Sequence, residues 1–173
     1  MRRNVDIAVL DAAAATTAID ELADVLVDCV AGGAGVSFML PFSHEEAVAF
    51  FRGVIGAVAR GGIVLIAAKD GGRIVGTVQL AVDLPPSQPH RADVKKLLVH
   101  RSARRRGVGP ALMAKLEEEA RARGRWLLVL DSATGPAERL YTRLGWTRAG
   151  VIPNYALWPD GSPCDTIYFW KRV

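Results

Sequence analysis

The sequence has few of the residues that hold small secreted or metal-binding proteins together. It contains two cysteines, Cys29 and Cys164, which lie too far apart along the chain to form a metal-binding motif. The three histidines, His44, His90 and His100, are equally scattered. We therefore expect no metal site. Because at most one disulfide could form, a reducing cytoplasm is the simpler location for the protein.

Long apolar runs are missing as well. No segment approaches the roughly 18 uninterrupted apolar residues that a transmembrane helix needs. The first ten residues carry Asp6 and lack the apolar core of a signal peptide. Half of the 173 residues are hydrophobic and 23% are charged, which is ordinary for a globular protein. We expect one domain over residues 1–173 and no association with a membrane.

The excess of positive charge is modest and is gathered in two clusters. The net charge is +4 at pH 7, and the isoelectric point is near 9.4. Much of the excess lies in residues 101–106 and 121–125. A phosphorylated small molecule fits the first cluster better than a duplex does, because no nucleic-acid recognition motif accompanies the charge. We expect no nucleic-acid partner; the alternative is a basic protein that binds DNA or RNA in a strongly salt-dependent way.

Hydrophobic spacing and capping residues predict two helices in the first third of the chain. Residues 16–30 have a helical period, with Thr16 or Thr17 available as the N-cap. Ser43 could cap a second helix, and Glu46 stands three residues further on, where a capping box needs it. Glycines follow both segments and would end the helices.

The rest of the sequence reads as strands and two further helices. A hairpin is predicted where Asp70-Gly71-Gly72 separates two β-rich runs. Strands are expected over residues 5–10, 63–69, 73–82, 92–99, 126–131, 146–152 and 166–172, and helices over residues 110–122 and 136–144. This order predicts an α+β protein in which a mixed, mostly antiparallel sheet carries helices on both faces.

An apolar strand runs directly into an arginine-rich turn with two glycines, at residues 97–109. The glycines let the backbone approach a ligand closely, and the N–H groups at the start of the next helix attract anions. Arg104, Arg105 and Arg106 add fixed positive charge that suits phosphate oxygens. The turn has neither the Gly-Lys-Ser/Thr ending of a P-loop nor the third glycine of the dinucleotide fingerprint. It predicts a phosphate site, with a solvated basic turn as the alternative.

Two motifs together resemble the GNAT acetyltransferase superfamily. Residues 104–109 follow the Arg-x-x-Gly-x-Gly pattern of its pyrophosphate loop, and residues 137–146 (Ala-x-x-x-Tyr-x-x-x-Gly-Trp) are similar to the segment that borders the cofactor thiol. The resemblance implies the GNAT fold, with acetyl-CoA as the acyl-donor cosubstrate. It assigns contacts with acetyl-CoA to Leu97, Leu98, Val99, Arg104, Arg105, Arg106, Gly107, Val108, Gly109, Thr134, Ala137 and Tyr141. Thr134 stands where the family often has asparagine.

A narrower resemblance points to one branch of the superfamily. Residues 32–39, 129–131 and 153–169 are similar to the tabtoxin-resistance acetyltransferases. This implies acetylation of the amino group of a small molecule, such as an amino-acid-like toxin or antibiotic. We expect direct transfer in a ternary complex, because neither cysteine lies in a motif. The alternatives are a non-catalytic acyl-CoA sensor and a protein-lysine acetyltransferase, and the sequence leaves open whether the protein is a monomer or a homodimer.

Three side chains are candidates for the chemistry. Tyr141 could donate to the departing thiolate, unless its hydroxyl simply faces water. An amine is mostly protonated at neutral pH and must lose a proton before it attacks a thioester. Asp93 and Asp131 are both candidate bases, through resemblance to two different GNAT branches. The alternative for Asp131 is a helix N-cap or a partner for the substrate ammonium. For Asp93 it is an ion pair with Arg91 or Lys95.

Overall fold

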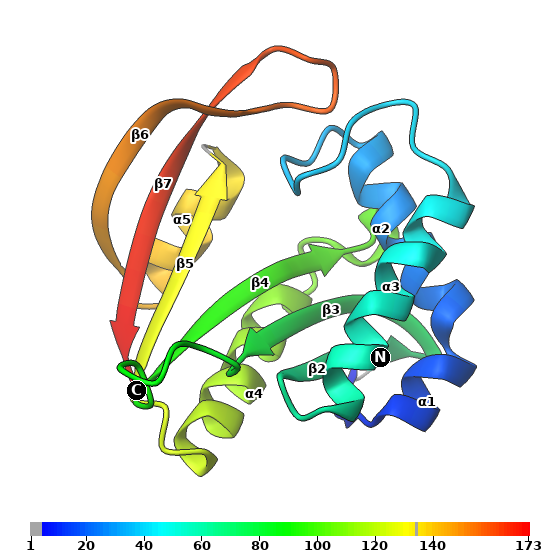
Figure 1. Ribbon diagram of the computed structural model, residues 1–173. Helices are drawn as coiled ribbons and strands as arrows, with labels where there is room; N and C mark the ends of the chain where they lie inside the picture. The colour runs from blue at the N-terminus through cyan, green and yellow to red at the C-terminus, as the bar shows by residue number, and fades with distance from the viewer. Residues whose placement is uncertain (1–4, 134) are drawn as a thin grey trace.

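The computed structural model describes residues 5–133 and 135–173, so the expectation for Thr134 falls outside the described residues. Seven strands form one sheet in the order β1-β2-β3-β4-β5-β7-β6 (Figure 1). The strands are β1 (Asp6–Leu10), β2 (Ile63–Asp70), β3 (Arg73–Ala81), β4 (Arg91–Val99), β5 (Leu127–Ala133), β6 (Thr147–Leu157) and β7 (Pro163–Arg172). All neighbouring strands are antiparallel except β4 and β5. The predicted α+β class and mixed sheet are confirmed.

Helices cover both faces of the sheet, but unequally. They are α1 (Ala12–Thr17), α2 (Ile19–Ala31), α3 (His44–Ala59), α4 (Val108–Ala122) and α5 (Pro136–Arg143), with a short 3-10 turn, η1 (Arg101–Ala103), before α4. The first three lie over β2, β3 and β4, whereas β5, β7 and β6 extend beyond them (Figure 1). In the described part of the chain, no helix combines the length and apolarity needed to cross a membrane.

The sheet separates two apolar cores. The sequence of strand β2 is apolar without alternation because both of its faces are buried. Ile66 packs into the core under α4, and Leu65 packs into the core under α2 and α3. Both side chains are fully buried. The first core also takes in Tyr141 of α5 and Phe169 of β7, so it continues beneath the far half of the sheet. The central strands are therefore held from both sides.

The first helix begins earlier than the sequence suggested. The N–H of Ala14 donates to the Asp11 carboxylate at 2.7 Å, which makes Asp11 the N-cap of α1. The chain then breaks at Ala18, and α2 follows without a side-chain cap. The prediction that Thr16 or Thr17 caps the helix is wrong, because both hydroxyls donate to carbonyls four residues back inside α1. An aspartate placed directly after β1 provides a cap one turn sooner.

Other local predictions are confirmed. The N–H of Glu46 donates to the Ser43 hydroxyl at 3.2 Å, and the N–H of Ser43 donates to the Glu46 carboxylate at 2.8 Å, so α3 starts in a capping box. Strands β2 and β3 form the predicted hairpin. Helix α4 begins at residue 108 rather than 110, and β6 and β7 are longer than expected, running to residue 157 and from residue 163.

The two parallel strands separate soon after they meet. Pairing of β4 with β5 is restricted to residues 91–93 and 127–129, beyond which the strands diverge (Figure 1). A bulge in β4 follows, since Gln79 pairs with Lys95 but Thr77 pairs with Leu98. Lys96 has a φ of 52° at this bulge. The extra residue reverses the alternation of side chains, and Leu98 therefore points into the core under α2.

The capping box gives a first test of how α3 is held. Ser43→Ala removes one side-chain acceptor for the helix N-terminus, and we expect the free energy of unfolding to fall by about 1 kcal/mol. Urea denaturation followed by circular dichroism measures the change. Ser87→Ala, in an exposed loop, is the matched control and should leave stability unchanged. Equal losses in the two variants would show that the box contributes nothing.

Candidate active site

The turn before α4 presents a row of unused backbone donors. Arg105 and Gly107 have left-handed backbones, with φ values of 60° and 81°, and Gly107 is the N-cap of the 15-residue helix α4. Within the described residues, the N–H groups of residues 105–109 have no acceptor. Residues of negative and positive φ thus alternate from the extended Arg104 to Gly107, and turns of this kind can direct neighbouring N–H groups into a concave anion site. The positive end of the α4 dipole adds to it.

The three neighbouring arginines have different surroundings. Arg104 turns away from the N–H row, with Nε donating to the Val99 carbonyl at 3.1 Å. Arg106 pairs with Asp70 at 2.9 Å. Arg105 is exposed and forms no ion pair within residues 5–133 and 135–173. Of the three predicted phosphate ligands, Arg105 is therefore the one whose guanidinium has no competing partner in the described structure.

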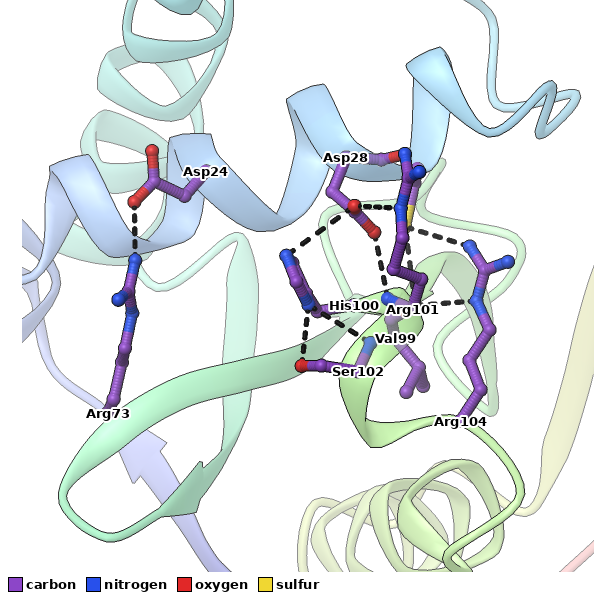
Figure 2. A network of polar contacts seen from close by, with 9 residues as sticks. Asp24, Asp28, Arg73, Val99, His100, Arg101, Ser102 and Arg104 are labelled. Carbon is purple, nitrogen blue, oxygen red and sulfur yellow. Dashed lines mark hydrogen bonds and ion pairs between the residues drawn. The ribbon is translucent and has the colours of Figure 1, made fainter.

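A polar network ties the turn to α2 (Figure 2). The Asp28 carboxylate accepts hydrogen bonds from the N–H of Arg101, at 2.8 Å, and from the Arg101 guanidinium. His100 Nε2 lies 3.5 Å from the same carboxylate, and His100 Nδ1 lies 2.8 Å from the Ser102 hydroxyl. The Asp28 side chain is only 11% exposed, so these contacts are partly shielded from water. Sequence reasoning missed Asp28 because nothing near it in the chain signals a partner 73 residues away.

The last residues of β4 turn backbone groups toward the gap between β4 and β5. The N–H of His100 donates to Val75 on β3, and Leu98 pairs with Thr77 on the same strand. Successive backbone groups of a strand point to opposite sides. The N–H groups of Leu97 and Val99 therefore point away from β3, toward the side where β5 has separated. Val99 accepts bonds from Arg104 and from the Cys29 thiol, which fix its orientation.

Tyr141 lies on α5, in the core that continues beneath β5 and β7. Only 6% of the residue is exposed, and its ring packs against Trp146 and Phe169 at centroid distances of 6.0 and 5.6 Å. Burial raises the pKa of Tyr141 to about 12, and the negative charge of Asp131 contributes further. The hydroxyl therefore stays protonated at neutral pH. Ala137, one turn earlier on α5, packs against the same core.

Asp131 acts electrostatically on several groups around the gap. Besides raising the pKa of Tyr141, its charge contributes to the raised pKa of Tyr168, which is about 12 mainly because Tyr168 is hydrogen-bonded to Tyr155. The same charge opposes the burial that lowers the pKa of Lys96. These groups come from β4, α5 and β7. Asp131, on β5, therefore lies near enough to all three elements for its charge to act on them.

The two candidate bases differ in their partners. Asp93 forms an ion pair with the Arg91 guanidinium, which is one of the roles that the sequence analysis gave as the alternative to a catalytic base. Asp131 is exposed, and no side chain in the described parts of the chain pairs with its carboxylate. It lies inside β5, four residues before the Gly135 N-cap of α5, so it is not a helix cap. A cavity of about 170 Å³ separates the two carboxylates, and it is lined by Asp93, Val94, Lys95, Val129, Leu130, Asp131 and Tyr168.

The chain belongs to the acetyltransferase (GNAT) family, which residues 36–146 match. It is 30% identical over 105 residues to an IAA acetyltransferase of Azospirillum brasilense; the alignment covers 60% of this chain, and the chain spans 65% of that relative. An N-acetyltransferase of Staphylococcus aureus has the same fold, with a TM-score of 0.80, 19% identity and 98% of each chain covered. A Salmonella typhimurium protein solved with its cofactor acetyl-CoA has a TM-score of 0.77 and 18% identity, with 97% of this chain and 93% of that chain covered.

The network at Asp28 predicts how firmly the turn is held. Asp28→Asn removes the charge that Arg101 binds, and hydrogen bonds to charged groups contribute about 1.5–3 kcal/mol. We expect amide hydrogen exchange in residues 101–104, whose N–H groups are hydrogen-bonded in and around η1, to become about 10- to 100-fold faster. Asp24→Asn is the matched control on the same helix, since Asp24 pairs with Arg73 rather than with the turn (Figure 2). Unchanged exchange in the Asp28 variant would contradict the role of the network.

Proposed function

We propose that this chain transfers an acetyl group from acetyl-CoA to the amino group of a small molecule, directly within a ternary complex. One observation carries the proposal: β4 and β5 separate beside a row of free N–H donors. The gap offers backbone donors for an extended polar chain, and the row offers donors for phosphate. A molecule that joins a pyrophosphate to a long amide-containing arm fits both.

The residues present suit acetyl-CoA. The N–H groups of residues 105–109 and the free Arg105 guanidinium would hold the pyrophosphate. The exposed edge of β4 at Leu97 and Val99 would bind the amide groups of the pantetheine arm. The side chains of Ala137 and Tyr141 would lie beside its sulfur. When bound, acetyl-CoA supplies an activated acetyl group and a sulfur leaving group.

The side chains around the gap divide the chemistry between them. Asp131 accepts the proton of the incoming ammonium, and the free amine then forms a bond to the acetyl carbon. Backbone N–H groups of β4 donate to the carbonyl oxygen as negative charge develops on it. As the carbon–sulfur bond breaks, its electron pair goes to sulfur. The Tyr141 hydroxyl, kept protonated by its raised pKa, donates a hydrogen bond to that sulfur. The second proton of the amine leaves nitrogen as the amide forms and goes to the thiolate, so the products are the acetylated amine and the free thiol.

The acceptor in this proposal is an amino-acid-like small molecule. Its support is the resemblance of residues 32–39 and 153–169 to acetyltransferases that inactivate such a toxin. Both segments border the face of the sheet on which Asp131 lies: the loop after α2 and the β6–β7 hairpin meet through a hydrogen bond from the N–H of Leu40 to the carbonyl of Pro159, at 2.9 Å. This contact restricts the room available to an acceptor.

Tyr141→Phe tests the proposed contact with sulfur. The ring packing is preserved and only the hydroxyl is lost, so we expect kcat to fall by about 100-fold. The dissociation constant of acetyl-CoA, measured by calorimetry, should stay nearly the same. Full turnover in this variant would remove Tyr141 from the mechanism.

The two carboxylates can be separated by their pH profiles. Asp131→Asn should lower kcat/KM by about 100-fold or more at pH 7. Without a base, the rate should rise about tenfold per pH unit toward the amine pKa near 10, because only the free amine reacts. Asp93→Asn should keep the wild-type profile. A rising profile in the Asp93 variant, with normal behaviour of the Asp131 variant, would reverse the assignment.

A further inference from the structure

We infer that the acceptor site selects amines that also carry a carboxylate, and that Lys96 binds this carboxylate opposite Asp131. The inference rests on the proposed function and names the class of its second substrate. Lys96 belongs to the bulge of β4, at the gap described above. It takes no part in the proposed transfer chemistry.

The backbone at Lys96 is strained in a way that points to a ligand. Its φ of 52° is left-handed, and the residue is not glycine. Ser37, in the loop after α2, has a φ of 78°. Left-handed backbones cost non-glycine residues free energy and gather at ligand sites, where the surrounding structure holds them. The two strained residues meet directly, because Lys96 Nζ donates to the Ser37 hydroxyl at 3.0 Å.

The charge of Lys96 has no carboxylate partner in the described structure. Its ammonium is half-buried, held by the Ser37 hydroxyl and lying 5.7 Å from the centre of the Phe38 ring. Within residues 5–133 and 135–173 no acidic group comes within 4.0 Å of it. Lys115 and Lys171 each pair with glutamate, at 3.0 and 2.7 Å, whereas Lys69 and the exposed Lys95 also have no acidic partner in the described residues. Among the three unpaired lysines, Lys96 is the one whose ammonium is held in place, by the Ser37 hydroxyl and the Phe38 ring. Partly buried charges are normally paired, so an anionic group of the ligand would complete the site.

Asp131 provides the negative charge that would bind the ammonium of such an acceptor. Its charge is close enough to oppose the lowering of the Lys96 pKa that burial causes, yet the two side chains form no ion pair. Amino-acid-like molecules carry the matching pair of charges, an ammonium for Asp131 and a carboxylate for Lys96. A diamine would place a second cation beside Lys96, which like-charge repulsion disfavours.

The surroundings of Lys96 favour a small acceptor. The loop that carries Ser37 packs against the far side of the gap, since a Cβ on Gly35 would lie 2.9 Å from Ala133 Cβ and 3.0 Å from the Trp158 ring. This close approach, together with the Leu40–Pro159 hydrogen bond, bridges the gap on the acceptor face. A free amino acid needs less room beneath such a bridge than a lysine within a folded protein.

The test compares matched acceptors. Amino acids with α- and ω-amino groups, and the primary amide of each, are supplied with acetyl-CoA while free thiol is followed. Within each pair the carboxylate is replaced by an amide, and because this also lowers the pKa of a nearby amino group, kcat/KM is expressed per free amine. In the wild type, we expect kcat/KM to be at least about tenfold higher for the amino acids than for their amides. Lys96→Met should bring this ratio close to one, whereas Lys96→Arg should preserve most of it.

Lys115→Met removes the same charge from the surface of α4 and is the control, with an unchanged ratio. The affinity for acetyl-CoA, measured separately, checks that the Lys96 variants are folded. A wild-type enzyme that acetylates acids and amides equally would overturn the inference but leave the proposed function standing. A preference for acids over amides that both Lys96→Met and Lys96→Arg retain would also overturn the inference and leave the proposed function standing. Absence of transfer to every amine would overturn the proposed function itself.

Discussion

The separation of β4 from β5 is the constraint on which the rest of the structure depends. A strand that leaves its neighbour exposes backbone N–H and C=O groups, and buried groups of this kind need partners. Here the parallel pairing stops at Asp93 and Val129, and the bulge at Lys96 follows three residues later. The core under α4 holds Val94 of β4 and Leu130 of β5 together, and the core under α2 holds Leu98 at the end of β4. The gap is therefore a built feature of the sheet.

Helix α2 connects the two ends of the gap. Its last turn carries Asp28, which binds the start of η1, and Cys29, whose thiol donates to the Val99 carbonyl. The loop after the same helix carries Ser37, which contacts Lys96 on the acceptor side. A helix far from the motifs in sequence thus supports both the turn proposed to hold the cofactor and the bulge proposed to bind the acceptor.

Much of the fold follows from local sequence, and much of the site does not. The capping box at Ser43, the hairpin at Asp70-Gly71-Gly72 and the order of the elements are encoded within a few residues, so they could be predicted. The Asp11 cap was missed because the predicted helix began at residue 16, where Thr16 and Thr17 offered caps to the segment with a helical period. The bulge at Lys96 has no local signal, since lysine does not favour a left-handed backbone and the shifted register depends on packing under α2. The sequence offered the Arg91–Asp93 ion pair but could not separate Asp93 from Asp131, because the place of each carboxylate relative to the gap depends on where β5 leaves β4.

The most direct measurement is a titration of the isotope-labelled protein with coenzyme A, followed by the NMR shifts of its backbone amides. If the gap between β4 and β5 is the cofactor site, the largest shifts will fall on residues 105–109 and on Leu97 and Val99, whose N–H groups face the gap. The edge strand β6 will change little. Shifts confined to β6 or to the outer surface of α3, or no saturable shifts at all, would contradict a cofactor site between β4 and β5.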